Sequence, residues 1–243
     1  MRVPLTFAIA LGATLLVGCA TGTETTARDP QPEAPAAPSA LGFEMTGNEA
    51  APLDYSSPGL PYDSVSVLVV RGARPRQVAK ILGADLSRTV HPDEVDLLPE
   101  ERTVWSFRRI DGGVLAVELT GYGDPTRSAL AKLSAIGGSA AVVRDDIDAI
   151  TRFAAATDGA LVFDGDEYAF VDDPALYPDH LRSIASRAWV DLSKPLTDTE
   201  EDPFTVGLEL ITAHTGLTFG MAEIESTAER SGFSAPTLVY ITE

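Results

Sequence analysis

The chain has 243 residues, with 36 acidic and 18 basic side chains and a formal net charge of −18 at pH 7. Such an acidic surface repels nucleic acid phosphates and anionic lipid headgroups, which argues against nucleic-acid binding. The chain has one cysteine, so it has no intramolecular disulfide, and a folded domain must depend on its apolar core.

The N-terminus has the features of an export signal. A small positive region, Met1-Arg2, precedes an uncharged apolar run of thirteen residues from Leu5 to Val17. This run is shorter than the roughly 20 residues of a membrane-spanning helix. Its length, position and charge predict a secretory signal peptide over residues 1–18.

The signal ends in Leu16-Val17-Gly18-Cys19, which resembles the lipobox of bacterial lipoproteins. The resemblance implies that the Cys19 thiol receives a diacylglycerol and that Cys19 becomes the mature N-terminus. Two acyl chains anchor a protein stably where one chain binds only marginally. We therefore expect a lipid anchor on the extracytoplasmic face of the cell membrane. An ordinary cleaved signal with an incidental cysteine and an uncleaved anchor remain the alternatives.

Residues 19–61 are rich in Pro, Ala and Thr, a composition typical of disordered tethers. The mature chain lacks Arg2 and carries a formal charge of −19, so the lipid rather than a basic patch would hold it at the membrane. We expect an α+β domain over residues 62–172. A C-terminal helical extension, residues 173–243, is expected to pack on the same domain.

Strands and helices alternate in the first part of that domain. A strand is predicted over 64–70, and Arg74-Pro75 begins a helix that Gly83 ends. Residues 104–110 and 114–120 are predicted to form a hairpin through Asp111-Gly112. A second helix is expected from Asp124-Pro125 to Gly137.

Further strands are predicted over residues 139–144, 149–157 and 160–164, with a short one over 168–171. Helices are predicted over 179–188 and from Asp202-Pro203 to Gly216. Hairpins outnumber long crossovers, so the sequence predicts an α+β fold. We expect a mainly antiparallel sheet with helices on one face, plus a C-terminal helical segment.

Short elements follow one another in a characteristic order in this chain: Val70-Arg71-Gly72, Pro75, Leu82-Gly83-Ala84-Asp85, Trp105, Glu118, Leu130, Leu133-Ser134, Arg152-Phe153, Asp158-Gly159 and Phe163. Through this order, the region from about Val65 to Glu225 resembles an uncharacterised bacterial domain family of unknown function. The resemblance implies a shared α+β domain. It transfers no catalytic residue, because that family has no established activity.

The sequence predicts no catalytic residue, cofactor or metal site. No Gly-x-Ser-x-Gly motif occurs, and the three histidines, His91, His180 and His214, do not have zinc-ligand spacing. Glu118 is the most suspect acid, because it lies in an otherwise apolar strand. Its carboxyl is expected to have a raised pKa through burial, or to pair with Arg108 or Arg152 across the sheet.

A second acidic candidate is the turn Asp164-Gly165-Asp166-Glu167, which does not follow the EF-hand pattern. Turn chemistry alone would select Asp and Gly there, and a weak calcium site is the other interpretation. Glu118, Asp164 and Asp166 together form a speculative acidic site.

Three functions remain open on the sequence. The leading hypothesis is a non-enzymatic lipoprotein that presents an interaction domain to an envelope protein partner. The second is an envelope hydrolase that uses carboxylates such as Glu118 and Asp158. The third is a weak calcium or small-molecule binding module.

Overall fold

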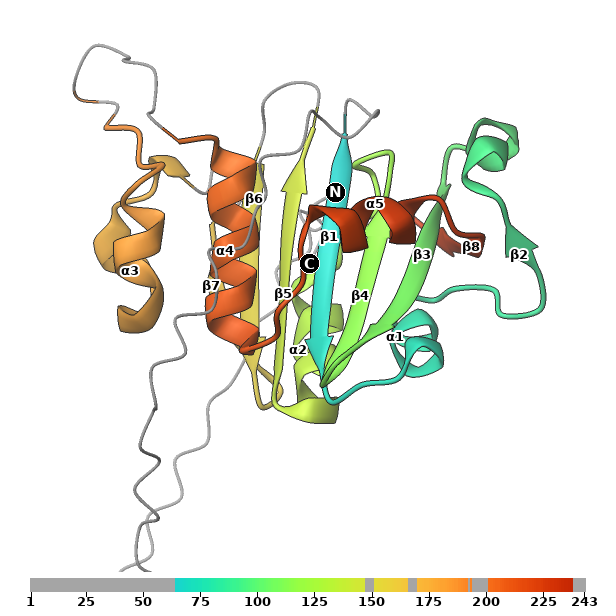
Figure 1. Ribbon diagram of the computed structural model, residues 1–243, viewed down its shortest axis with the longest axis horizontal. Helices are drawn as coiled ribbons and strands as arrows, with labels where there is room; N and C mark the ends of the chain where they lie inside the picture. The colour runs from blue at the N-terminus through green and yellow to red at the C-terminus, as the bar shows by residue number, and fades with distance from the viewer. Residues whose placement is uncertain (1–63, 147–150, 166–169, 192, 194–200, 238–243) are drawn as a thin grey trace, which may run out of the picture. The chain divides into compact units, whose positions relative to one another are not determined.

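The computed structural model describes residues 64–146, 151–165, 170–191, 193 and 201–237, which belong to one unit built on an antiparallel sheet (Figure 1). The predicted signal peptide, lipid-modified cysteine and tether lie outside the described residues. Among the residues described, no helix is both long and apolar enough to cross a membrane.

The described strands form one sheet in the order β2-β8-β3-β4-β1-β5-β6-β7, and every neighbouring pair is antiparallel. Their bounds are β1 Val65–Arg71, β2 Thr89–Val90, β3 Arg102–Ile110, β4 Gly113–Glu118, β5 Ser139–Asp145, β6 Thr151–Thr157, β7 Ala160–Asp164 and β8 Gly232–Pro236.

The α-helices are α1 Pro75–Ile81, α2 Arg127–Gly137, α3 Asp179–Ala185, α4 Pro203–Thr215 and α5 Met221–Ala228. Among the described connections, the short 3₁₀ helices η1 Pro92–Leu97 and η3 Pro174–Leu176 have full bounds. The fold is α+β, as predicted.

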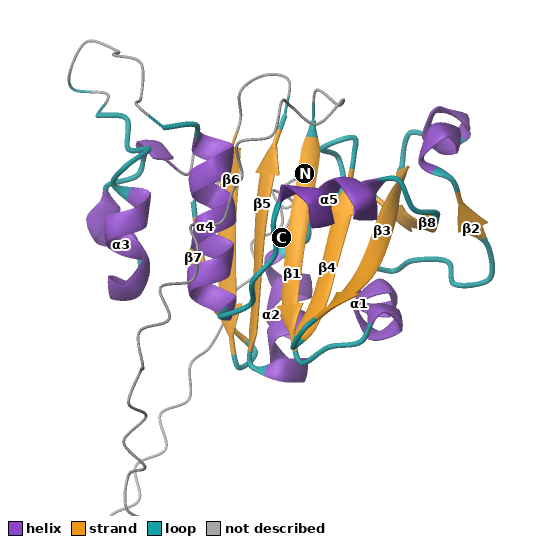
Figure 2. Cartoon of the chain, viewed as in Figure 1, coloured by secondary structure: helices purple, strands orange, loops and turns teal. Residues whose placement is uncertain are grey.

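Helices cover both faces of the sheet (Figure 2). On one face α1 and α2 pack against the sheet, with Leu130 and Leu133 of α2 fully buried beside Leu68 of β1. The C-terminal segment supplies α4 and α5 to the opposite face, where Leu208 and Ile224 join the second core cluster. Helices α1 and α2 lie together on one face of the sheet, as predicted. The C-terminal helices α4 and α5 cover the opposite face.

The central strand β1 is buried between these layers. Six of its seven residues are buried, with only Arg71 exposed. Side chains alternate between faces along a strand, so Val67 and Val69 meet the α4 and α5 layer while Leu68 and Val70 meet α2. This explains why the segment is a continuous apolar run rather than an alternating one.

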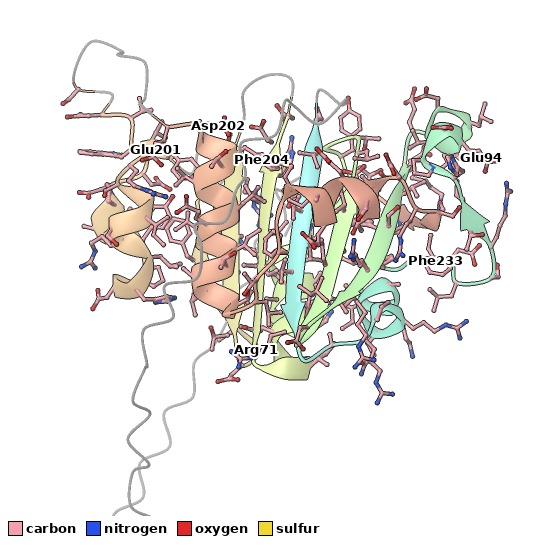
Figure 3. The ribbon with its side chains drawn as sticks, in the orientation of Figure 1. Arg71, Glu94, Glu201, Asp202, Phe204 and Phe233 are labelled. Atoms are coloured by element: carbon pink, nitrogen blue, oxygen red, sulfur yellow. The ribbon has the colours of Figure 1, made fainter. Side chains whose placement is uncertain are left out.

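Helix α4 has the predicted ends. Asp202 caps it by accepting a hydrogen bond from the Thr205 amide at 2.8 Å, and Phe204 is buried on its first turn (Figure 3). Gly216 ends it at a φ of 67°, in the left-handed region that glycine tolerates. The Arg71 guanidinium donates to the Thr215 carbonyl at 3.2 Å, which places a cation at the helix C-terminus.

Several predicted boundaries were wrong. Helix α2 begins at Arg127 rather than at Asp124-Pro125, because Thr126 caps it through the Ala129 amide. Phe170 and Val171 lie in a 3₁₀ turn instead of a strand, and residues 166–169 lie outside the described part. Helix α5 and strands β2 and β8 were not predicted, and β8 enters the sheet between β2 and β3.

Candidate functional site

A row of polar side chains runs across neighbouring strands, on the face of the sheet that α2 covers. Glu118, Ser66, Arg144 and Arg152 are partners in neighbouring strands, in the order β4, β1, β5, β6. Directly paired residues of antiparallel strands point to the same face, so these four form one row, called here the polar row. Glu118, Ser66 and Arg152 are fully buried, which is costly for charged groups without partners.

Glu118 is held by donors from strand β3 and from the loop that follows β4. Its carboxylate accepts hydrogen bonds from the hydroxyls of Thr103 and Thr120, from the Thr120 amide at 2.9 Å and from the Gly123 amide at 3.2 Å. The predicted arginine pairing was wrong: Arg108 donates to Ser226, and Arg152 binds other carboxylates. Four donors match the acceptor capacity of one carboxylate, so this group fixes the loop after β4.

At the other end of the polar row, Arg152 lies between two buried aspartates. It forms ion pairs with Asp124 and, at 3.0 Å, with Asp164, and Arg127 reaches the same Asp164 at 2.8 Å. The Arg144 guanidinium lies 3.8 Å from Asp124. Ion pairs in this cluster therefore connect β5, β6, β7 and the segment before α2.

Burial raises the pKa of Asp124 to about 6, against the opposing pull of Arg152 and Arg144. Because the folded state then binds the proton more tightly than the unfolded chain, Asp124 contributes stability below about pH 4. This contribution is lost as the pH rises through about 4 to 6. Burial also raises the pKa of Asp145 and lowers that of His214.

Replacing Asp124 with asparagine should remove this pH dependence. We expect the unfolding free energy of the unmodified protein, relative to Asp124→Asn, to rise by up to about 3 kcal/mol between about pH 7 and pH 4. Urea denaturation of both proteins across this range measures the difference. The other titrating groups are common to both, so a difference that stays constant or reverses would contradict the assigned pKa direction.

The loop of residues 119–126 runs between these two buried anchors. Glu118 fixes its beginning, and Asp124 fixes its end through Arg152. Between them Tyr122 is 69% exposed. The loop thus presents an aromatic ring on a backbone that buried carboxylates hold in place.

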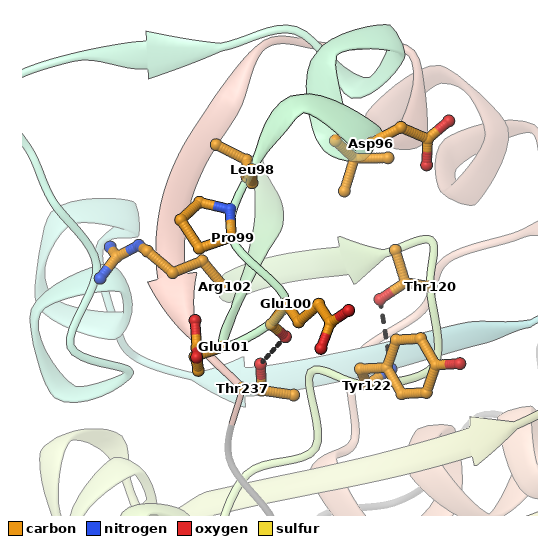
Figure 4. Close-up of a pocket in the computed structure, with 10 residues that line it drawn as sticks. Asp96, Leu98, Pro99, Glu100, Glu101, Arg102, Thr120, Tyr122 and Thr237 are labelled. Carbon is orange, nitrogen blue, oxygen red and sulfur yellow. Dashed lines mark hydrogen bonds between the residues drawn. The ribbon is translucent and has the colours of Figure 1, made fainter.

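Tyr122 lines a groove of about 730 Å³ (Figure 4). Its walls come from η1, from the connection to β3 with the first residue of that strand, from the 119–126 loop and from the residue after β8. The lining residues are Val95, Asp96, Leu98, Pro99, Glu100, Glu101, Arg102, Thr120, Tyr122 and Thr237. We call it the acidic groove, because three carboxylates and one guanidinium line it. Its volume is typical of ligand pockets.

Arg102 is the one cationic side chain among the described residues that line the acidic groove, and it already has partners. Arg102 donates to the Ser234 hydroxyl at 2.7 Å and to the Ser234 carbonyl at 2.8 Å, which ties it to β8. Within the described residues, Asp96, Glu100 and Glu101 form no side-chain ion pair, and all three are exposed. The acidic groove therefore carries three carboxylates that form no ion pair with a described side chain.

The predicted acidic site is not one site. Glu118 and Asp164 lie on the same sheet face, with β1, β5 and β6 between their strands. Asp166 lies outside the described residues. Asp158 is in the β6–β7 turn, six residues along β6 from Arg152, so it is at the opposite end of the strand from the polar row. The carboxylates considered for a hydrolase are thus not brought together.

The described residues contain no group of three or more His, Cys, Asp or Glu side chains arranged to hold a metal ion. The His180 and His214 rings stack at 5.7 Å, and the His214 Nε2 atom lies 3.0 Å from the Ala156 carbonyl oxygen. Both contacts are ordinary packing between α3, α4 and β6.

No protein-family model, no curated protein sequence and no solved structure matches this chain. The residues therefore carry the functional argument alone.

Replacing Glu118 with glutamine tests whether this acid is structural. Glutamine replaces one acceptor oxygen with an NH2 group, which would face donors that the carboxylate now accepts from, so we expect the free energy of unfolding to fall by about 1–3 kcal/mol. Urea denaturation measures it, with Glu94→Gln on exposed η1 as the control and a change within about 0.5 kcal/mol expected there. An unchanged stability of Glu118→Gln would show that the four donors do not depend on the carboxylate.

Proposed function

We propose that this chain is a lipid-anchored lipoprotein of the extracytoplasmic membrane face, and that its α+β domain is a non-enzymatic module that binds an envelope protein. The anchor is supported by the short apolar run and by a sole cysteine at the end of Leu16-Val17-Gly18-Cys19. Two acyl chains would suffice for stable attachment.

The acidic groove is the observation that supports binding. It combines a concave surface, carboxylates without ion-pair partners among the described residues and an exposed Tyr122 on a fixed loop. Tyrosine is enriched in binding interfaces, because its ring gives large contact area at low conformational cost. By contrast, the buried acids Glu118, Asp124 and Asp164 are occupied by the protein's own donors.

Neither alternative has comparable support. For a hydrolase, Glu118 and Asp158 lie at different ends of the sheet. For a calcium site, the Asp164 carboxylate already binds Arg127 and Arg152. Binding of a small molecule in the acidic groove would be a different outcome, and displacement of a bound peptide by spermidine distinguishes it from binding of a protein.

Site-specific photo-crosslinking in intact cells tests the binding proposal. A photoreactive amino acid at Tyr122 should trap one reproducible adduct of defined mass. The same group at Leu176, which is 65% exposed but outside the groove, should not trap it. The proposal fails if both positions give the same adducts or if Tyr122 gives none.

A further inference from the structure

We infer that the acidic groove receives a basic peptide segment of the partner, whose lysine or arginine side chains bind the Tyr122 ring and the carboxylates of Glu100 and Glu101. This inference rests on the proposed binding function and adds the chemistry of the partner. Charge, the apolar lining and the position of Tyr122 favour such a partner.

Charge complementarity points to a cation. Glu100 and Glu101 are consecutive, exposed and without ion-pair partners among the described side chains. Their backbone carbonyls are fixed instead, since Thr237 donates to them through its hydroxyl at 3.2 Å and its amide at 2.8 Å. The two carboxylates are therefore attached to a backbone that β8 holds in place, while the side chains remain free to bind.

Tyr122 supplies a second feature that favours a cation. In Figure 4 the carboxylate of Glu100 extends toward Tyr122, whose hydroxyl points away from Glu100, and Asp96 lies across the groove from them. An ammonium or guanidinium group is attracted to the face of an aromatic ring as well as to carboxylates. The loop is held by Glu118 and Asp124, so the ring needs little rearrangement before it binds.

The apolar part of the lining indicates a peptide rather than a free ion. Val95, Leu98 and Pro99 lie beside the carboxylates, and Leu97, the last residue of η1, is 82% exposed. A bare cation makes no use of these surfaces. A peptide that carries basic and aliphatic side chains fills both, and 730 Å³ accommodates a few residues.

The test uses the full-length protein in a non-ionic detergent and a fluorescent peptide, Gly-Lys-Leu-Lys-Gly-Lys, with its Lys→Glu counterpart as the negative probe. Fluorescence anisotropy should show binding of the basic peptide alone, weakening as salt rises. Glu100→Gln/Glu101→Gln should weaken binding about fivefold. Asp111→Asn/Glu229→Gln removes the same charge from exposed positions outside the groove and should weaken it less than about twofold.

Variants at Tyr122 separate the ring from the hydroxyl. Tyr122→Phe should bind the basic peptide within about twofold of the unmodified protein, and Tyr122→Ser about threefold or more weakly. Equal weakening by the groove pair and the control pair would overturn the inference, because general acidity would then explain binding. Displacement by spermidine at the peptide's own concentration would also overturn it, in favour of a free polyamine. Either result leaves the Tyr122 crosslink unaffected, so the binding proposal is judged separately.

Discussion

Replacing Arg152 with methionine is expected to lower the free energy of unfolding by about 3–5 kcal/mol, the largest effect of any substitution proposed for the described domain. Methionine keeps most of the side-chain volume but leaves Asp124 and Asp164 buried without their shared cation. An uncompensated buried charge is far more costly than a lost surface pair. Urea denaturation at neutral pH measures the change.

Arg127→Met is the matched control. Arg127 binds the same Asp164, but its side chain is 51% exposed, so its loss should cost less than about 1 kcal/mol. Adding Asp124→Asn to Arg152→Met should recover part of the lost stability, because it removes the buried charge of Asp124, whose remaining cation Arg144 lies 3.8 Å away, whereas Asp164 keeps Arg127. If Arg152→Met were as stable as Arg127→Met, the buried cluster would not hold the domain together.

Replacing Cys19 with alanine is expected to abolish lipid attachment. The lipobox resemblance implies that cleavage follows acylation of the thiol, so the variant should accumulate with residues 1–18 still present and no fatty acid incorporated. Labelling cells with an alkyne fatty acid, followed by purification and mass analysis, measures both properties.

Gly18→Ala controls for changes at the cleavage site. It retains a small residue before the cysteine, so labelling and cleavage should both persist. A Cys19→Ala protein that is cleaved and labelled as before would contradict lipidation at this residue.

Sequence patterns predicted the parts of the fold that local chemistry determines. The β3–β4 hairpin follows from Asp111-Gly112 between two apolar strands, and α4 follows from a proline start and a glycine stop. Strands β2 and β8 have only two and five residues, and their pairing joins segments more than a hundred residues apart. No local periodicity reports such pairing, so these strands were missed.

The site was predictable only in part. Glu118 stood out as an acid in an apolar strand, and it is fully buried. Its partners were not predictable, because Thr103 reaches it only through the register of β3 and β4. Asp124 before Pro125 matched a helix cap, whereas its side chain binds Arg152 from β6. The same local pattern serves capping and ion pairing, and only the tertiary fold selects between them.

The acidic groove had no sequence signal at all. Glu100, Tyr122 and Thr237 come from three separate connections and meet only after β8 has entered the sheet beside β3. Each residue alone is an ordinary surface residue. Their functional interpretation depends on shape and on unneutralised charge, which are properties of the folded domain.

The proposed lipid anchor would place the acidic domain and its groove at the membrane, so it decides where the domain would act. Intact-mass analysis of the mature protein, purified from membranes, tests it most directly. We predict a chain that begins at Cys19 and carries the additional mass of a diacylglycerol. A mature chain that begins at another residue, or at an unmodified Cys19, would contradict the claim.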